Sequence, residues 1–336
     1  MRKIIRFLAL VVLILVVIYL MGPKPPQVEM NKDLPSISAS IANIDDFVKK
    51  NDEGLNLKPD NESRIIWAND SVKERTTYSL LYLHGFSASW YEGYPANTTF
   101  AAYFGCNAYF PRLASHGIET EDPLIDMTPD RLWESAKEAL IVARTLGRKV
   151  IIMSTSTGGT LALKLAADFP EYVDGLILYS PNIRINNGAT FLLSKPWGLQ
   201  IGRKVTGGNY RIVNEDFDSK YCKYWNCKYR MEAVVFLQQL VEETMNNQTY
   251  KNVSDPLFLG YYYKDETHQD DIVKVEPMLK MFDHLGTDPN SKVKVAFPEA
   301  GNHVIGNELL SKSYKDVIAE TIKFGEDVLH LKPANK

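Results

Sequence analysis

The sequence predicts an α/β fold in which a mostly parallel central sheet is flanked by helices. Short apolar runs rich in β-branched or aromatic residues, typical of buried strands, occur at residues 78–83, 150–153 and 256–263. Helical patterns lie between them, and the clearest of these spans residues 128–146. Strands that alternate with helices pair in parallel through crossover connections, so this order predicts a sheet with helices on its faces.

Residues 148–170 contain a strand, a tight turn and a helix in direct succession. The strand 150–153 is followed by Ser-Thr-Ser-Thr-Gly-Gly, and leucines and alanines then recur at i,i+4 until Pro170 ends the helix. Such a turn holds its middle residue, Ser156, in a strained backbone with an exposed hydroxyl. Ser154 replaces the first glycine of the usual G-x-S-x-G pattern. The pentapeptide alone therefore fits either a nucleophilic serine or a polar turn between two core elements.

Composition limits the class of protein. At 336 residues, 45% of them hydrophobic, the chain can bury one large core or two modest ones. Its net charge of −3, without a basic stripe, argues against nucleic acid as a partner. No Cys/His spacing predicts a zinc site. Cys222 and Cys227 form a local disulfide if the compartment is oxidising and otherwise remain thiols, and Cys106 is unpaired in both cases.

Residues 1–22 predict a membrane anchor or a signal peptide. Three basic residues among the first six precede an apolar run that ends at Met21. No small-x-small cleavage site follows, because the next residues are Gly-Pro-Lys-Pro-Pro. We therefore expect an uncleaved anchor with the body of the protein extracytoplasmic, and secretion after cleavage is the alternative. Residues 23–63, rich in Pro, Asn, Lys and Asp, are expected to form a linker.

The strand predicted at residues 78–83 ends in the run His-Gly-Phe-Ser. A glycine directly after a buried strand lets the chain turn so that the next N–H, that of Phe86, points into a cleft. The Thr157 N–H, which follows Ser156 at the start of a helix, is positioned as a second donor. Two such donors form an oxyanion hole, which stabilises the charge that develops on a carbonyl oxygen under attack. Phe86 and Thr157 are therefore the candidate oxyanion-hole residues.

Together these segments resemble the α/β-hydrolase superfamily, in particular carboxylesterases and monoacylglycerol-lipase-like serine hydrolases. The His-Gly-Phe-Ser run is similar to the oxyanion loop of that branch, and residues 108–117 resemble a second characteristic segment of it. The resemblance covers about residues 78–181 and 256–329. It implies an α/β-hydrolase core at residues 64–181 and 252–336.

Residues 182–251 interrupt the alternation of strands and helices. A segment of this length after a core strand resembles the cap of the superfamily, which roofs the active site and shapes substrate choice. A surface insertion without a role in specificity is the alternative. Aromatic residues in this segment predict a pocket for an apolar acyl or aryl group, although such residues also simply pack in a core. They are Tyr221, Tyr224, Trp225, Tyr229 and Phe236.

The resemblance implies a catalytic acid in the loop after the strand at residues 256–263, and two aspartates compete for that role. Asp265 has the usual distance from the strand's proline. Asp270, in the run Asp-Asp-Ile-Val, has the better local match and the usual distance to the next helix, so we expect it to be the acid. His303 follows the last predicted strand and completes the superfamily order Ser, Asp, His. His268, in the acid loop, is the alternative base by position.

The sequence therefore predicts a serine hydrolase that cleaves carboxylic esters through an acyl-enzyme. His303 would remove the proton of Ser156, and Asp270 would orient His303 and stabilise its imidazolium form. The expected partners are a small-molecule ester and, through the N-terminal segment, a membrane; no metal ion or cofactor is implied. An amidase or peptidase on the same fold is one alternative, and a catalytically silent hydrolase fold that serves as a binding module is another.

Overall fold

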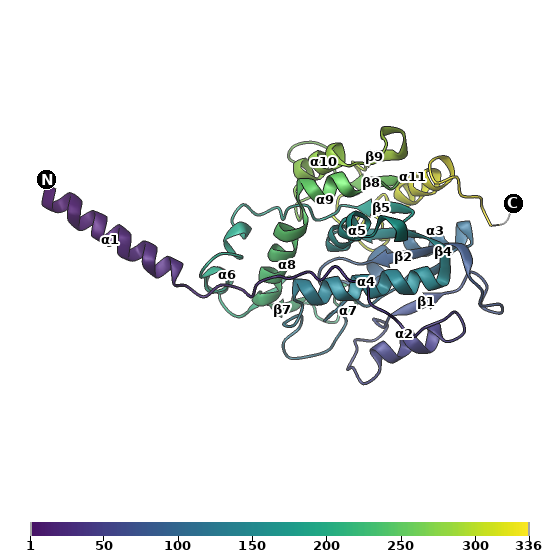
Figure 1. The fold of residues 1–336 in the computed structure, drawn as a ribbon, viewed down its shortest axis with the longest axis horizontal. Coiled ribbons are helices and arrows are strands. Elements are labelled where there is room, and N and C mark those ends of the chain that lie inside the picture. Colours follow the sequence, from purple (N-terminus) through teal and green to yellow (C-terminus); the bar gives the residue numbers. More distant parts are fainter. Residues whose placement is uncertain (1, 335–336) are drawn as a thin grey trace.

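The computed structural model describes residues 2–334, and its centre is a seven-stranded sheet (Figure 1). The strands lie in the order β1-β3-β2-β4-β5-β8-β9, in which β1 runs antiparallel to β3. The remaining neighbours are parallel, which confirms the predicted fold class. The strands are β1 (Arg64–Ile66), β2 (Thr76–Leu83), β3 (Asn107–Phe110), β4 (Gly147–Thr155), β5 (Gly175–Tyr179), β8 (Leu257–Tyr261) and β9 (Lys292–Ala296).

Two separate apolar clusters cover the two faces of the sheet. Successive residues of a strand point to opposite faces. Leu80 and Tyr82 of β2 accordingly belong to one cluster, and Leu81 and Leu83 belong to the other. The helices that pack into the first cluster are α3 (Ala96–Phe104) and α11 (Tyr314–Asp327), and those that pack into the second are α4 (Pro129–Leu146), α5 (Thr157–Asp168), α8 (Met231–Thr244), α9 (Asn247–Asn252) and α10 (Val275–His284).

The boundaries of α4 follow from its sequence. The Thr128 hydroxyl accepts a hydrogen bond from the Arg131 N–H (3.3 Å), which satisfies one of the free donors at the helix start. Pro129 occupies the first helical position, where its missing N–H costs nothing, and Gly147 follows the last turn. The helix predicted at residues 128–146 is confirmed in these details.

Helix α1 (Arg2–Leu20) projects away from the body and buries none of its side chains (Figure 1). Among the described residues it is the helix that is long and apolar enough to cross a membrane. A signal peptide satisfies the same criteria of length and composition.

Residues 23–63 differ from the expected linker because they pack along the body. Met30, Ile44 and Val48 are buried in the larger apolar cluster, the last two on α2 (Ile44–Asp52). The fully buried Lys137 on α4 donates from Nζ to the carbonyl oxygen of Asn31 (2.9 Å). A buried ammonium needs such acceptors, so the segment completes the core that α4 begins.

Residues 182–251 contribute no strand to the central sheet. They form a separate two-stranded antiparallel pair and several helices, and Cys222 and Cys227 form a disulfide within them. Cys106 is a free, buried thiol. The elements before α8 are the 3-10 turn η3 (Thr190–Leu192), α6 (Gly198–Thr206), β6 (Tyr210–Ile212), α7 (Lys220–Tyr224) and β7 (Lys228–Arg230); further 3-10 turns are η1 (Trp90–Gly93), η2 (Pro170–Tyr172) and η4 (Pro289–Ser291).

Candidate active site

Ser156 lies at the sharp turn between β4 and α5. Its backbone has φ 54° and ψ −119°, a left-handed conformation that costs energy in a residue with a Cβ. The Ser156 N–H donates to the Tyr179 carbonyl (3.0 Å), and the Ser156 carbonyl accepts from the Asn182 N–H (2.9 Å). These bonds to the neighbouring strand end and the segment after it hold the strained residue in place.

The turn requires small residues after the serine. A Cβ on Gly158 would lie 1.9 Å from the Leu83 carbonyl oxygen, and one on Gly159 would lie 2.6 Å from the Pro181 Cβ. The position two residues before the serine is less restricted. Ser154 is fully buried in β4, and a Cβ on Gly159 would be 3.6 Å from its hydroxyl, an ordinary contact. The Ser154 hydroxyl therefore has room in this turn, where the usual pattern has glycine.

His303 and Asp270 form a buried pair. The His303 Nδ1–H donates to Oδ2 of Asp270 at 2.6 Å. The other oxygen of Asp270 accepts the N–H groups of Ile272 (2.9 Å) and Val273 (3.0 Å). Burial disfavours the charged imidazolium, but the charge and the hydrogen bond of Asp270 outweigh it and raise the pKa of His303 above its usual value. The Nε2 atom is buried and has no partner among the described residues.

The structure places Asp265 elsewhere. It is exposed, and its carboxylate accepts hydrogen bonds from Thr267 (2.7 Å) and from the His268 ring (2.9 Å). These bonds lower the pKa of Asp265, chiefly through Thr267. Asp270, and not Asp265, is therefore brought together with His303, and His268 pairs with Asp265 at the surface.

The candidate oxyanion residues adjoin Ser156. A Cβ on Gly85 would lie 3.0 Å from the Ser156 Cβ, so the loop after β2 passes directly beside the serine. Thr157 is the first residue of α5, where an N–H has no acceptor within the helix. In residues 2–334 the Phe86 N–H donates no hydrogen bond, whereas the N–H groups of Gly85 and Ser87 on either side are bonded.

Two buried histidines support this loop. His84 Nε2 accepts from the Leu113 N–H (3.1 Å), and His116 Nε2 accepts from the Ser87 N–H (3.1 Å). Burial lowers the pKa of His116 to about 4 and that of His84 well below its usual value. Both rings are therefore neutral at pH 7 and act as fixed acceptors that join the loop to residues 113–116.

Glu92 also belongs to the candidate site, although no pattern in the sequence singles it out. It is buried on η1, lines the same cavity as Ser156, and its Oε2 accepts the Gly85 N–H at 2.5 Å. Burial raises the pKa of Glu92 to about 7, although the Gly85 hydrogen bond opposes the shift. The available signal was a single carboxylate between aromatic and glycine residues in Trp-Tyr-Glu-Gly, directly after the oxyanion loop.

A cavity of about 710 Å³ joins these residues. Three of the aromatic residues expected in the pocket, Tyr221, Trp225 and Tyr229, line it. The other two lie elsewhere: Tyr224 stacks on Tyr91 with ring centroids 4.1 Å apart, and Phe236 lines a smaller hollow next to the segment 23–26. The main lining residues are Phe86, Glu92, Ser156, Thr157, Asn182, Ile185, Arg211, Ile212, Val213, Tyr221, Trp225, Tyr229, Asp271, His303 and Val304.

The cavity wall includes both core and inserted residues. The Phe86 ring meets Tyr229 of β7 edge to face at 4.9 Å, and the Asn226 N–H donates to the Ser87 carbonyl at 2.7 Å. The insertion therefore contacts the loop that carries Phe86 directly. In the part of the chain that the structure describes, no group of three or more His, Cys, Asp or Glu side chains is arranged to hold a metal ion.

Residues 80–306 match the model of a family described as the alpha/beta hydrolase family. None of the curated proteins compared with the chain matches it. Among solved structures, one from work on LipS and LipT, two metagenome-derived lipolytic enzymes, has 16% identity and a TM-score of 0.63 and covers 80% of this chain and 98% of its own.

Two further similar structures are monoacylglycerol lipases. The one from Paleococcus ferrophilus has 13% identity and a TM-score of 0.54 and covers 78% of this chain and 98% of its own. A soluble variant of the Saccharomyces cerevisiae enzyme, in complex with a substrate analog, has 13% identity and a TM-score of 0.53 and covers 90% and 98%. At this identity the likeness concerns the fold.

Proposed function

The chain belongs to the alpha/beta hydrolase family, and from this premise we propose that it is a serine hydrolase that cleaves carboxylic esters through an acyl-enzyme intermediate. One observation carries the proposal. His303, held by Asp270, keeps its Nε2 atom buried and unpaired among the described residues on the wall of the cavity that Ser156 also lines. A base with a free nitrogen beside a strained serine is the arrangement that nucleophilic catalysis requires.

In the proposed mechanism, His303 Nε2 takes the proton from the Ser156 hydroxyl while the Ser156 oxygen attacks the ester carbonyl carbon. The C–O bond to the alcohol breaks, and the imidazolium returns the proton to the departing alcohol oxygen. Water then repeats the sequence on the acyl-enzyme, which releases the acid and restores Ser156. Asp270 keeps the proton of the neutral ring on Nδ1, so that Nε2 is the basic atom.

The N–H groups of Phe86 and Thr157 are the proposed oxyanion donors. Both lack an acceptor among the described residues, and they lie on the two segments that meet at Ser156. The start of α5 adds the positive end of a helix dipole at the same place. Removing one such donor typically costs about 10²–10³ in rate.

The aromatic wall of the cavity supports an ester with an apolar acyl or aryl group. Tyr221 and Trp225 are stacked with centroids 4.7 Å apart, and both line the cavity from the inserted segment, which we propose to be a cap over residues 64–181 and 252–336. An amidase or peptidase would use the same residues, and a silent binding module would share the fold.

We propose that α1 is retained as an anchor and that the body is extracytoplasmic. The basic residues lie before the apolar run, which by the positive-inside rule favours a cytoplasmic N-terminus. The disulfide between Cys222 and Cys227 fits an oxidising compartment. Secretion after cleavage is the alternative, and the mass of the mature protein in membrane and soluble fractions separates the two.

The test of the catalytic proposal uses the full-length protein in detergent. A fluorophosphonate probe should label it, and p-nitrophenyl esters of graded chain length should be hydrolysed faster than the matched anilides. Ser156→Ala should abolish both labelling and turnover, whereas Ser154→Ala should retain both. Faster cleavage of the anilides would favour an amidase, and a folded wild type that neither labels nor turns over would favour the binding module.

A further inference from the structure

An apolar surface of the inserted segment is exposed on α6. Trp197 directly precedes this helix, and Ile201 and Val205 follow at intervals of four residues, so the three side chains lie on one side of it. Their exposed fractions are 37%, 39% and 80%. We call these three residues the cap face. Seven of the eleven exposed large apolar side chains in the described chain after Met21 lie between residues 191 and 217, so exposed apolar surface is concentrated here.

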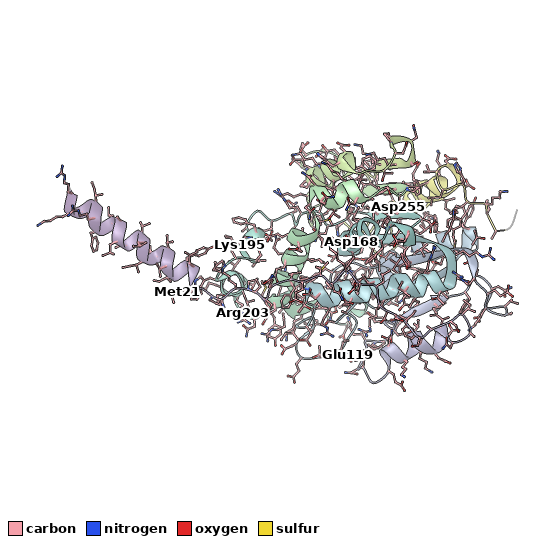
Figure 2. The ribbon with its side chains drawn as sticks, viewed as in Figure 1. Met21, Glu119, Asp168, Lys195, Arg203 and Asp255 are labelled. Atoms are coloured by element: carbon pink, nitrogen blue, oxygen red, sulfur yellow. A yellow bond between two sulfur atoms is a disulfide. The ribbon has the colours of Figure 1, made fainter. Side chains whose placement is uncertain are left out.

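Trp197 connects the cap face to the candidate anchor. Its backbone N–H donates to the Pro23 carbonyl (2.9 Å), and its indole N–H donates to the Ile18 carbonyl (3.1 Å). Gly22 packs so closely on the indole that a Cβ there would lie 2.1 Å from the ring nitrogen. Figure 2 shows Met21, Lys195 and Arg203 together at this junction. The start of α6 is therefore held at the end of α1.

This contact sets the depth of the cap face. Helix α1 has 19 residues, which span about 28 Å and match a hydrocarbon core of about 30 Å. Ile18 lies only two residues before the end of α1 at Leu20, or about 3 Å along the axis. A side chain bonded to Ile18 consequently lies at the boundary between hydrocarbon and headgroups, which is where tryptophan is enriched in membrane proteins.

The charges around the cap face are compatible with a lipid surface. Lys195 pairs with Glu242 (3.1 Å), and Arg203 pairs with Glu232 (2.6 Å), so nearby carboxylates are neutralised. Lys204, next to Val205, is exposed and forms no ion pair within residues 2–334. An apolar helix side flanked by basic residues is the pattern of helices that lie in the membrane interface.

A second cavity adjoins the one that contains Ser156. It has a volume of about 370 Å³ and is lined by Phe191, which is 53% exposed. Ile185, Asn187 and Thr190 line both this cavity and the larger one that contains Ser156. The two cavities therefore share a wall that is formed by residues of the inserted segment.

We propose that the cap face rests in the membrane interface and that the enzyme takes its ester substrate, a lipid, directly from the bilayer. The proposal rests on the proposed ester hydrolase function and on a retained anchor. A bilayer is preferred to a second copy of the chain as the occupant, because Trp197 ties the cap face to the end of a helix of membrane-spanning length. The insertion would then act as the entrance for substrate as well as the roof of the site.

The first test measures contact with lipid. The full-length chain with Val205→Cys is labelled with NBD and placed in nanodiscs of phosphatidylcholine and phosphatidylglycerol, with Val72→Cys, an exposed loop residue between β1 and β2, as the matched control. Cys106 is buried and the other cysteines are paired, so labelling is confined to the new thiol. A lipid that carries a doxyl quencher near its headgroup should reduce fluorescence at residue 205 and leave residue 72 unchanged.

Two results would overturn the proposal. Equal quenching at residues 205 and 72 would place the cap face in water. A blue-shifted NBD spectrum at residue 205 without doxyl quenching would show that protein, such as a second copy of the chain, covers the face instead of lipid.

The second test measures substrate delivery. Full-length Ile201→Asp/Val205→Asp is compared with the wild type and with Val72→Asp on a water-soluble short-chain ester and on a monoacylglycerol dissolved in the nanodisc. Loss of two apolar contacts with the interface should lower turnover of the lipid at least about tenfold. Turnover of the soluble ester should stay unchanged, because neither residue lines the cavity of Ser156.

The two proposals fail in different ways. If the wild type hydrolyses both esters and the double variant matches it on both, the cap face has no role in delivery and the inference is wrong. If the wild type hydrolyses neither ester, the proposed function is wrong, and the NBD comparison still decides whether the cap face contacts lipid.

Discussion

The Nδ1 atom of His303 lies 2.6 Å from Oδ2 of Asp270, while Asp265, five residues earlier, bonds the exposed His268 at 2.9 Å. The two carboxylates belong to one loop but differ in burial, since Asp270 is buried and Asp265 is exposed. A charge in the interior acts on its partner with little screening, whereas an exposed pair contributes little. This difference gives the two aspartates separable roles.

Replacing Asp270 should damage catalysis far more than replacing Asp265. Asp270→Asn keeps the shape but allows the wrong tautomer of His303 and removes the charge that stabilises imidazolium, so kcat should fall by about 10³–10⁴. Asp265→Asn is the matched control and should stay within about threefold, as expected for an exposed pair. Steady-state kinetics on a soluble p-nitrophenyl ester compare kcat of the two variants, and circular dichroism checks that both are folded. The assignment fails if Asp265→Asn is the more damaging change.

The activity should depend on pH through His303. The base must be neutral to accept the Ser156 proton, so kcat/KM should fall as pH drops through the pKa of His303. Burial lowers that pKa, but Asp270, together with Glu92 and Asp271, raises it above 6.5, so the midpoint of the acidic limb should lie above this value. In Asp270→Asn the main opposing charge is lost and burial remains, so the midpoint of the residual activity should move to lower pH. An unchanged midpoint in that variant would argue against His303 as the titrating base.

Glu92 should act as a positioning residue for the oxyanion loop. Its Oε2 accepts a hydrogen bond from the Gly85 N–H at 2.5 Å. Gly85 directly precedes Phe86, the proposed oxyanion donor. Glu92→Leu removes that acceptor, and a misaligned donor should lower kcat by up to about 10² with little change in KM. Glu92→Gln keeps an acceptor oxygen without the charge, so it should restore most of kcat. Because Glu92 raises the pKa of His303, Glu92→Gln should also move the acidic limb to lower pH.

A purely structural role for Glu92 predicts a different result. In that case both variants would lose thermal stability in parallel with activity, and the acidic limb would not move in the glutamine variant. The kcat and KM values, the melting temperatures and the pH profiles of the two variants together distinguish these outcomes.

The order of elements could be predicted from the sequence because it depends on local patterns. Buried strands and the capped helix α4 are encoded by periodicity and by the Thr128 and Pro129 signals, and both are present. The choice between Asp265 and Asp270 was harder, since both occupy the same loop and only the fold determines which one is buried against His303.

Other features depend on tertiary packing and carry no local signal. The polar composition of residues 23–63 indicates a linker, yet a few apolar side chains and acceptors for Lys137 are enough to dock the segment. Glu92 resembles any surface carboxylate until its burial is known. Likewise, the position of α6 at the end of α1 depends on the contact between Trp197 and Ile18, which are far apart in the chain.

The disulfide between Cys222 and Cys227 should stabilise the aromatic wall of the cavity. It closes a short loop that contains Trp225, a cavity-lining residue. The Nζ of Lys58, in the segment 23–63, donates to the Trp225 carbonyl at 2.8 Å. Closing a loop of this length should contribute about 2 kcal/mol to stability by the chain-entropy model. The double variant Cys222→Ser/Cys227→Ser should therefore melt at a lower temperature and lose kcat/KM on esters with large aryl groups more than on short acyl esters.

Reductant provides the control for this prediction. Dithiothreitol should shift the wild type toward the behaviour of the double variant and should leave the double variant unchanged, because Cys106 is buried and unpaired. Thiol titration of the unfolded protein before and after reduction reports whether the bond was present. If the wild type purified from an oxidising compartment already titrates three thiols, the bond is absent and the stabilising role is refuted. Equal losses on large and small esters would mean that the loop affects stability without shaping the cavity.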